Sequence, residues 1–169
     1  MLVQNLLNIL VAAVEHSDVN GIKIYGPSGE ERRPFTTYKY LLSYVKHRSK
    51  QLEKLESIDN KVVLMYFADH FDNIAWFWAI IAAGGIPCIC PPLGRDLDHC
   101  QKNVAHLQKL LGNPLVITTE HLASEFPSQS GLRVIKTGKN SNSWGSLNPL
   151  VSLSRCLLRQ GVSILGANK

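Results

Sequence analysis

The stretch from residue 61 to residue 93 constrains the fold most, because two apolar runs flank a helix-like segment. It reads KVVLMYFADHFDNIAWFWAIIAAGGIPCICPPL. Residues 61–67 are of types that favour a buried strand. Residues 74–83 are apolar on every side, which predicts a helix that is buried all round. Residues 86–90 predict a second short strand. The stretch therefore predicts one strand–helix–strand unit with parallel strands.

Polar residues, glycines and prolines mark the limits of this unit. Asp69 or Asp72 is expected to accept hydrogen bonds from the first N–H groups of the helix. Gly84 and Gly85 are expected to end the helix, because glycine tolerates the left-handed backbone conformation found there. The Pro91-Pro92 pair then stops further strand pairing, because proline has no N–H group to donate.

The rest of the chain continues to alternate helix-like and strand-like segments. Amphipathic helices are expected at residues 2–14, 38–55 and 97–111, with Leu52 and Leu55 on the buried side of the second. Short strands are expected at residues 22–25, 114–119 and 132–136, and residues 120–126 predict a short helix or turn. This order predicts an α/β fold, a parallel sheet with helices on both faces.

Residues 26–29, Gly-Pro-Ser-Gly, superficially look like a phosphate-binding loop. They lack the Lys-Ser/Thr pair that follows such a loop, and no helix is expected to open from them. A turn between two short strands explains them better. The charged residues 30–33 are expected to form a connector that leads to Pro34.

A transmembrane span is the competing interpretation of residues 74–93, which are twenty positions without a charge. Two adjacent glycines and three prolines in that window would break a single helix, so no membrane partner is expected. The first sixteen residues carry no Lys or Arg, and Gln4, Asn5 and Asn8 interrupt their apolar run. They therefore do not match a signal peptide.

The basic residues gather in one place, within a chain of formal net charge +5. They are expected on the solvated side of the helix at 38–55: Lys46, His47, Arg48, Lys50 and Lys54. Nucleic-acid binding is not expected, because no aromatic residues interleave with this patch and no binding motif accompanies it.

The four cysteines, Cys88, Cys90, Cys100 and Cys156, include no CxxC pair. A zinc site made of Cys88, Cys90, His99 and Cys100 lacks the usual spacing, and His99 and Cys100 point to different sides of a helix. Small, buried, reduced thiols are the better interpretation, and they fit a cytoplasmic protein.

The candidate binding residues follow the strand that ends at Phe67. Ligands of open α/β sheets bind beyond the carboxyl ends of the strands, which points to Asp69 and His70 as substrate-binding residues. His70 has the right chemistry for acid–base work, and its alternative role is that of a polar residue at a helix start. His47, His99 and His106 are expected at the surface. No residue is assigned a catalytic role.

Two motifs of this chain resemble those of adenylate-forming enzymes. Residues 37–41, Thr-Tyr-Lys-Tyr-Leu, resemble the early Thr-Tyr-x-Glu-Leu motif, with Tyr40 where Glu is usual. Residues 77–79, 83–87 and 91–93 resemble a second motif, in which a helix ends in Ala-Gly and leads into a strand that closes with Pro. The resemblance covers about residues 5–138, and the chain looks most like fungal nonribosomal-peptide-synthetase-like adenylation domains.

This resemblance implies that residues 1–138 are the N-terminal portion of an adenylation domain, with an incomplete fold, and that residues 139–169 are a linker and tail. Complete members of the family convert a carboxylic acid and ATP, with Mg, into an acyl-adenylate. A Ser/Thr/Gly-rich loop ending in Pro-Lys holds the triphosphate there, and a C-terminal lysine stabilises the adenylate. The Ser-rich run at residues 140–146 does not match that loop, because no Pro-Lys follows it.

A truncated adenylation domain without activity of its own is therefore the first hypothesis. It would bind no cofactor by itself, and its partners would be the remainder of an adenylation domain or a second copy of the chain. A complete small α/β ligand-binding protein is the first alternative. An interaction module, in which the exposed edge of the sheet pairs with another chain, is the second.

Overall fold

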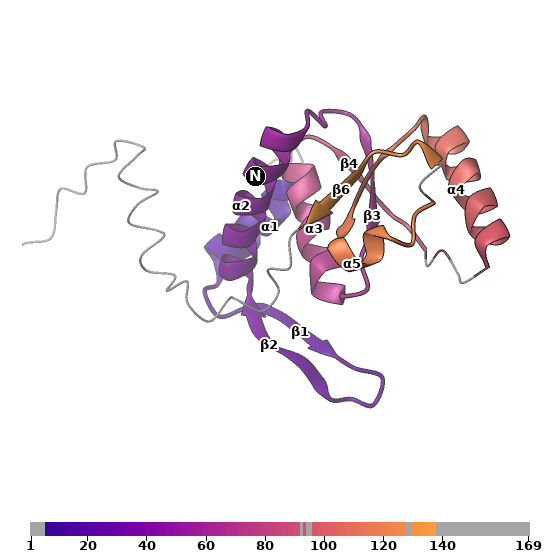
Figure 1. Cartoon of the computed structure of the whole chain (residues 1–169). Coiled ribbons are helices and arrows are strands. Elements are labelled where there is room, and N and C mark those ends of the chain that lie inside the picture. Colours follow the sequence, from indigo (N-terminus) through magenta and orange to yellow (C-terminus); the bar gives the residue numbers. More distant parts are fainter. Residues whose placement is uncertain (1–5, 92, 94–95, 128–129, 138–169) are drawn as a thin grey trace, which may run out of the picture. The chain divides into compact units, whose positions relative to one another are not determined.

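Helices and strands alternate along the chain in the computed structural model, which describes residues 6–91, 93, 96–127 and 130–137 (Figure 1). Their order is α1 (Leu7–His16), β1 (Gly21–Tyr25), β2 (Glu31–Thr37), α2 (Tyr38–Leu55), β3 (Val62–Tyr66), α3 (His70–Ala82), β4 (Ile86–Ile89), α4 (Leu97–Leu111), β5 (Leu115–Thr119), α5 (Glu120–Ala123) and β6 (Val134–Thr137). The expected linker and tail at 139–169 lie outside the described residues.

Four parallel strands form the central sheet, in the order β4-β3-β5-β6. Val63 of β3 lies beside Pro87 of β4 on one side and Leu115 of β5 on the other. The helices α3, α4 and α5 connect successive strands of this sheet. The predicted α/β class with a parallel sheet is confirmed.

The two faces of the sheet carry separate apolar clusters, because neighbouring residues of a strand point to opposite faces. Val63 and Met65 of β3 belong to a cluster with residues of α2 and α3, which we call the α2–α3 face. Leu64 and Tyr66 belong to a cluster with residues of α4, which we call the α4 face. Figure 1 shows α4 on one side of the sheet and α2 and α3 on the other.

Helix α3 begins and ends at the predicted signals. Asp69 is its N-cap residue, and the Asp69 side chain accepts a hydrogen bond from the backbone N of Asp72 at 3.0 Å. Gly84, just past its end, has a φ of +82°. The helix starts at His70, one turn earlier than residue 74, because the capped polar turn is itself helical.

The expectation that this helix is buried all round is wrong. Phe71, Ala75, Trp76, Ala79 and Ile80 form its buried stripe. A second apolar stripe, made of Ile74, Trp78 and Ile81, is only partly buried. The cause is that a single helix can turn just one side to a sheet, and Ile74, Trp78 and Ile81 lie outside the apolar cluster that packs against it.

The charged residues after the Gly-Pro-Ser-Gly turn form strand β2 rather than the expected connector. Strand β2 pairs antiparallel with β1, and the turn closes with a hydrogen bond from Gly29 N to Gly26 O at 3.0 Å. Pro34 is tolerated within β2 because a two-stranded ribbon leaves one side of each strand without a partner. The turn between two short strands is confirmed.

Helix α2 differs from its predicted pattern at two positions. Arg48 was expected on the solvated side but is only 8% exposed, because its guanidinium lies over the rings of Tyr44 and Trp76. Leu55 was expected to be buried but is 58% exposed, because it is the last residue of the helix and the stripe that faces the sheet ends at Leu52.

Candidate functional site

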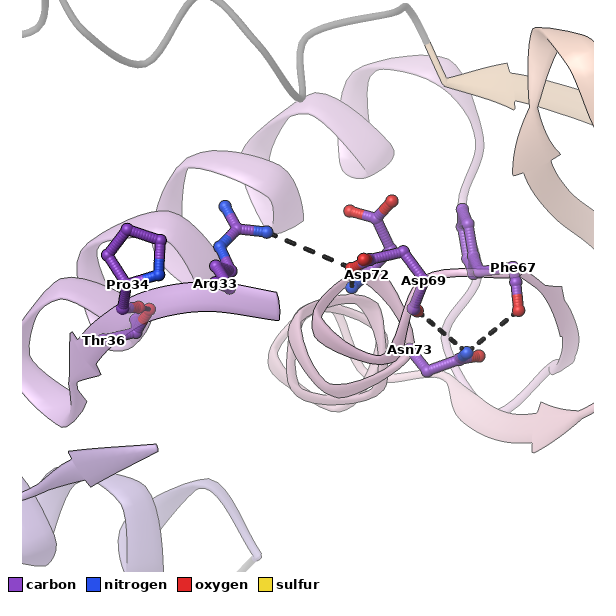
Figure 2. A network of polar contacts seen from close by, with 7 residues as sticks. All are labelled: Arg33, Pro34, Thr36, Phe67, Asp69, Asp72 and Asn73. Atoms are coloured by element: carbon purple, nitrogen blue, oxygen red, sulfur yellow. Dashed lines mark hydrogen bonds and ion pairs between the residues drawn. The ribbon is translucent and has the colours of Figure 1, made fainter. Parts of the chain in front are cut away.

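The turn between β3 and α3 lies at the carboxyl edge of the sheet, where ligands of α/β proteins bind. It contains the two predicted binding residues, Asp69 and His70, and both are exposed. Figure 2 shows this turn beside Arg33, which reaches it from β2. His47, His99 and His106 are exposed on helices, as predicted.

The Asp69 carboxylate already has partners from two elements. Its Oδ1 atom accepts from the Asp72 backbone N at 3.0 Å, and Nη1 of Arg33 lies 4.0 Å from the same oxygen (Figure 2). Asp69 therefore caps α3 and holds a cation from the hairpin. His70 is the first residue of α3, beside this cap.

Asn73 fixes the path of the backbone through the same turn. Its Nδ2 atom donates to the carbonyl oxygens of Phe67 and Asp69, each at 3.0 Å (Figure 2). Its Oδ1 atom is buried and has no hydrogen-bond partner among the described residues. The Asn73 amide group therefore fixes the backbone of this turn, from which the side chains of Asp69 and His70 project.

The surroundings of Asp72 favour its neutral, protonated form more strongly than water favours that form in an exposed aspartate. Burial raises the pKa of the Asp72 carboxyl, and the nearby Asp69 carboxylate raises it further. The guanidinium groups of Arg33 and Arg48 act in the opposite direction. The site thus combines two carboxylates and two cations around the start of α3.

A second polar group lies at the carboxyl end of β3, on the α4 face. The Tyr66 hydroxyl donates to the Glu125 carboxylate and lies 3.5 Å from the Leu93 backbone N, which donates to it. Thr118 of β5 donates through Oγ1 to the Tyr66 carbonyl oxygen at 2.6 Å. Burial and the hydrogen bond to Glu125 raise the pKa of Tyr66 to about 12, so this hydroxyl keeps its proton at neutral pH.

The thiols of the α4 face are structural rather than reactive. Burial, followed by the neighbouring Cys88 and Cys100 thiols, raises the pKa of Cys90 to about 11, and burial also raises the pKa of Cys100. Within the described ranges, no three His, Cys, Asp or Glu side chains lie close enough together to hold a metal ion. Every helix in those ranges lacks either the length or the apolar character of a membrane span.

The fold is shared with solved adenylation domains, although the chain matches no protein-family model. An adenylation domain of a keto acid-selecting nonribosomal peptide synthetase module aligns with a TM-score of 0.64 at 24% identity, over 79% of this chain and 26% of that one. The N-terminal subdomain of Klebsiella oxytoca NpsA aligns with a TM-score of 0.63 at 11% identity, over 97% of this chain and 34% of that one. At such identities these likenesses establish the fold alone.

Relatives that are similar in sequence show the family to which the chain belongs. Nonribosomal peptide synthetase acyN of Ascocoryne sarcoides is 36% identical over 134 residues, which are 78% of this chain and 14% of that protein. Nonribosomal peptide synthetase btyA of Aspergillus terreus is 30% identical over 149 residues, 88% of this chain and 16% of that protein. The chain is homologous to the N-terminal part of fungal nonribosomal peptide synthetase adenylation domains. It spans about one seventh of the length of these relatives.

Two places in this adenylation-domain homologue, the glycine turn and the start of α3, do not fit the triphosphate of ATP. In the glycine turn, Gly26 N donates to Glu30 O at 2.8 Å, and Ser28 N donates to Glu30 Oε2 at 3.1 Å. Those N–H groups are occupied, and the Glu30 carboxylate would repel a phosphate. At the start of α3, the carboxylates of Asp69 and Asp72 would do the same. We therefore derive no catalytic step from these residues.

The sequence predicted Asp69 and His70 as binding residues, and that role stays a prediction. It did not predict the contacts that Asn73, Arg33 and Glu125 make at this edge of the sheet. Asn73 stands four positions after Asp69 at the start of a helix, which is a usable signal for a side chain that bonds back to the turn. Arg33 and Glu125 gave no such signal, because each reaches the carboxyl edge from a distant segment.

Proposed function

We propose that this chain acts as the N-terminal portion of an adenylation domain and does not form an acyl-adenylate by itself. In the complete domain, a carboxylic acid would react with ATP, in the presence of Mg, to give the acyl-adenylate. The observation that carries this proposal is the extent of the matches, which span 78% of the chain but 14% of a homologous synthetase, and 79% of the chain but 26% of a solved adenylation domain. That solved domain is described as bound to a keto acyl adenylate, and a fatty acyl-adenylate ligase of the same fold as bound to acyl adenylate and pyrophosphate.

The contribution of this portion would be a scaffold, together with one edge of the ligand-facing surface. We place Asp69 and His70 on that surface, because both are exposed just beyond the carboxyl end of β3. The pocket for the acyl group and the groups that hold ATP and Mg would come from the remainder of an adenylation domain. Three described cysteines are free thiols, which is consistent with a reducing compartment such as the cytoplasm.

The alternative function, an interaction module that adds a strand to the sheet edge, has less support. The backbone N atoms of Ile86 and Cys90 donate to the carbonyl oxygens of Lys61 and Met65, at the two ends of β3. The backbone N positions of Pro87 and Ile89 therefore point away from β3. Pro87 has no N–H group, so β4 offers an incoming strand one donor fewer. This edge is therefore poorly suited to strand addition.

Pyrophosphate exchange tests the proposal. The full chain is incubated with ATP, Mg, labelled pyrophosphate and a panel of aryl, keto and fatty acids, and label in ATP is measured. We expect no acid-dependent exchange, while the adenylation domain of a full-length relative provides the positive control. Acid-dependent exchange above background by residues 1–169 would overturn the proposal.

A further inference from the structure

Two arginines and four aromatic rings form an unbroken series from the β1–β2 hairpin through α2 to the end of β3. We call this series the cation–aromatic ladder. Its members, in order of contact, are Arg33, Phe71, Tyr44, Arg48, Trp76 and Phe67. The guanidinium carbon Cζ of Arg33 lies 3.7 Å from the ring centroid of Phe71. That of Arg48 lies 4.9 Å from the centroid of Tyr44 and 5.3 Å from that of Trp76. The ring centroids are 5.6 Å apart in the Tyr44–Phe71 pair and 6.1 Å apart in the Phe67–Trp76 pair. All these separations are within the range of cation–π and aromatic pairing.

Arg48 is the central member and the least ordinary one. It is 8% exposed, yet none of the described carboxylates lies within 4.0 Å of it as an ion-pair partner. Its Nη1 atom donates to Gln51 Oε1 at 3.0 Å, whereas its Nε atom is buried and has no hydrogen-bond partner among the described residues. A buried charge with so few polar partners depends on the rings around it. The two rings therefore set the position of Arg48.

The two ends of the ladder meet at the turn between β3 and α3. Arg33, at one end, lies over Phe71 and reaches the Asp69 carboxylate that caps α3. Phe67, at the other end, stacks on Trp76 with an interplanar angle of 2°, and its carbonyl oxygen accepts from Asn73. The ladder thus includes Phe67 and Phe71 of this turn, and Figure 2 shows its two end residues, Arg33 and Phe67, with Asp69 between them.

We propose that Arg33 and Arg48 are positioning residues, which hold the turn at residues 67–73, and with it Asp69 and His70, against the hairpin and α2. The ligand-facing role of that turn rests on the proposed function. The mechanical coupling through the rings does not, because all its members are within this chain.

A double-mutant cycle measures the coupling. Arg33→Lys and Arg48→Lys keep the positive charge but lose the planar group that stacks on a ring. We expect each to lower the melting temperature of the full chain, and the double variant to lose less than the two single losses together. Arg32→Lys and Arg133→Lys, which are exposed ion-pair partners of Glu30 and Glu56, should leave the melting temperature almost unchanged. Strictly additive losses at Arg33 and Arg48 would overturn the ladder.

The chemical shift of the Asp72 backbone amide reports the position of the cap directly. Arg48 acts on the Asp72 carboxylate through its charge, and Arg48→Lys keeps that charge but loses the stacking on Tyr44 and Trp76. A shift of the Asp72 amide in Arg48→Lys therefore reports transmission through the rings of Tyr44, Phe71 or Trp76. We expect that shift, and a shift of the Trp76 indole signal in Phe67→Leu, a mild change at the half-buried end. If Arg48→Lys moved only the signals of α2, or Phe67→Leu left the Trp76 indole signal in place, the positioning role would be rejected. Both readouts use the chain without ATP, so they can fail or succeed independently of the exchange assay.

Discussion

The two faces of the sheet are built in different ways. The α2–α3 face is covered by two long helices and contains large apolar side chains such as Leu52, Ile58, Trp76 and Ile80, with Arg48 closing its rim. The α4 face is covered by one long helix and by residues from connecting segments, such as Leu93 and Phe126. It also contains the thiols of Cys88, Cys90 and Cys100 and the Tyr66–Glu125 hydrogen bond.

The α2–α3 face is therefore held by apolar packing, whereas the α4 face is held partly by polar contacts. The α2–α3 cluster draws chiefly on a continuous stretch of chain, from α2 to α3, and adds β5. The α4 cluster depends on segments after β4 and α5, which lie far apart in the chain. Since the α4 face is covered by one long helix and by short connecting segments, we expect it to open more readily than the α2–α3 face.

Trp76→Ala should have the largest effect, because it removes a large ring from the α2–α3 face. Trp76 is 4% exposed, and such a truncation costs about 3–5 kcal/mol of unfolding free energy. Trp78→Ala, at a half-buried position of the same helix, should cost clearly less. Urea unfolding of both variants measures the difference, and equal losses would contradict the assignment of the buried stripe of α3.

Gly84→Val and Gly112→Val compare the ends of the two covering helices. Both glycines have a positive φ, +82° and +67°, so valine introduces strain of about 1–3 kcal/mol at either site. At Gly84 the added Cβ would also lie 2.6 Å from Asp59 Oδ1, whereas nothing lies within 4 Å at Gly112. We expect Gly84→Val to give the larger drop in melting temperature. Equal drops would show that this crowding is relieved without loss of stability.

Tyr66→Phe tests the polar contact of the α4 face. It keeps the ring but removes the hydrogen bond to Glu125 and the long one from the Leu93 backbone N. We expect a loss of about 1–3 kcal/mol, because the exposed Glu125 can return to water but the buried Leu93 N–H loses its acceptor. Ultraviolet titration of the wild-type chain should include the ionisation of Tyr66 at about pH 12, and the variant should lose one tyrosine from this late part of the titration. A variant with unchanged stability would mean that packing alone holds this face.

Asp72→Asn should have the smallest effect, and its sign depends on pH. Because burial raises the pKa of Asp72, the folded chain binds this proton more tightly than the unfolded chain. The resulting stability is fully present below about pH 4 and is lost as the pH rises through the raised pKa. Asp72→Asn should remove this decline, whereas Asp98→Asn, an exposed residue in the first turn of α4, should keep it. Identical pH profiles for Asp72→Asn and the wild type would contradict the account.

Local signals in the sequence predicted much of this fold. Asp69 and Gly84 mark the two limits of α3, because each acts on backbone groups within a few residues of itself. The alternation of segments was enough to predict a parallel sheet. At the candidate site, the rule that ligands bind beyond the carboxyl ends of parallel strands selected Asp69 and His70, and their binding role stays a prediction.

Long-range contacts could not be predicted in this way. Tyr66 and Glu125 are 59 positions apart, and no pattern near either residue points to the other. Arg48 was assigned to the solvated side of α2 because a charge normally stays in water, and only the rings of Tyr44 and Trp76 reverse that preference. Charged residues also hid strand β2, whose pairing with β1 depends on the backbone rather than on side-chain pattern.

The association state of the full chain tests most directly the claim that it is one portion of a larger adenylation domain. The half-buried stripe of α3, Ile74, Trp78 and Ile81, and the exposed Ile86 and Ile89 of β4 would be covered in a complete domain. Light scattering, together with a dye that binds apolar surface, measures this exposure. We predict oligomers or strong dye binding at micromolar concentration. A monodisperse monomer with a cooperative melt and little dye binding would contradict the claim and favour a complete small α/β protein.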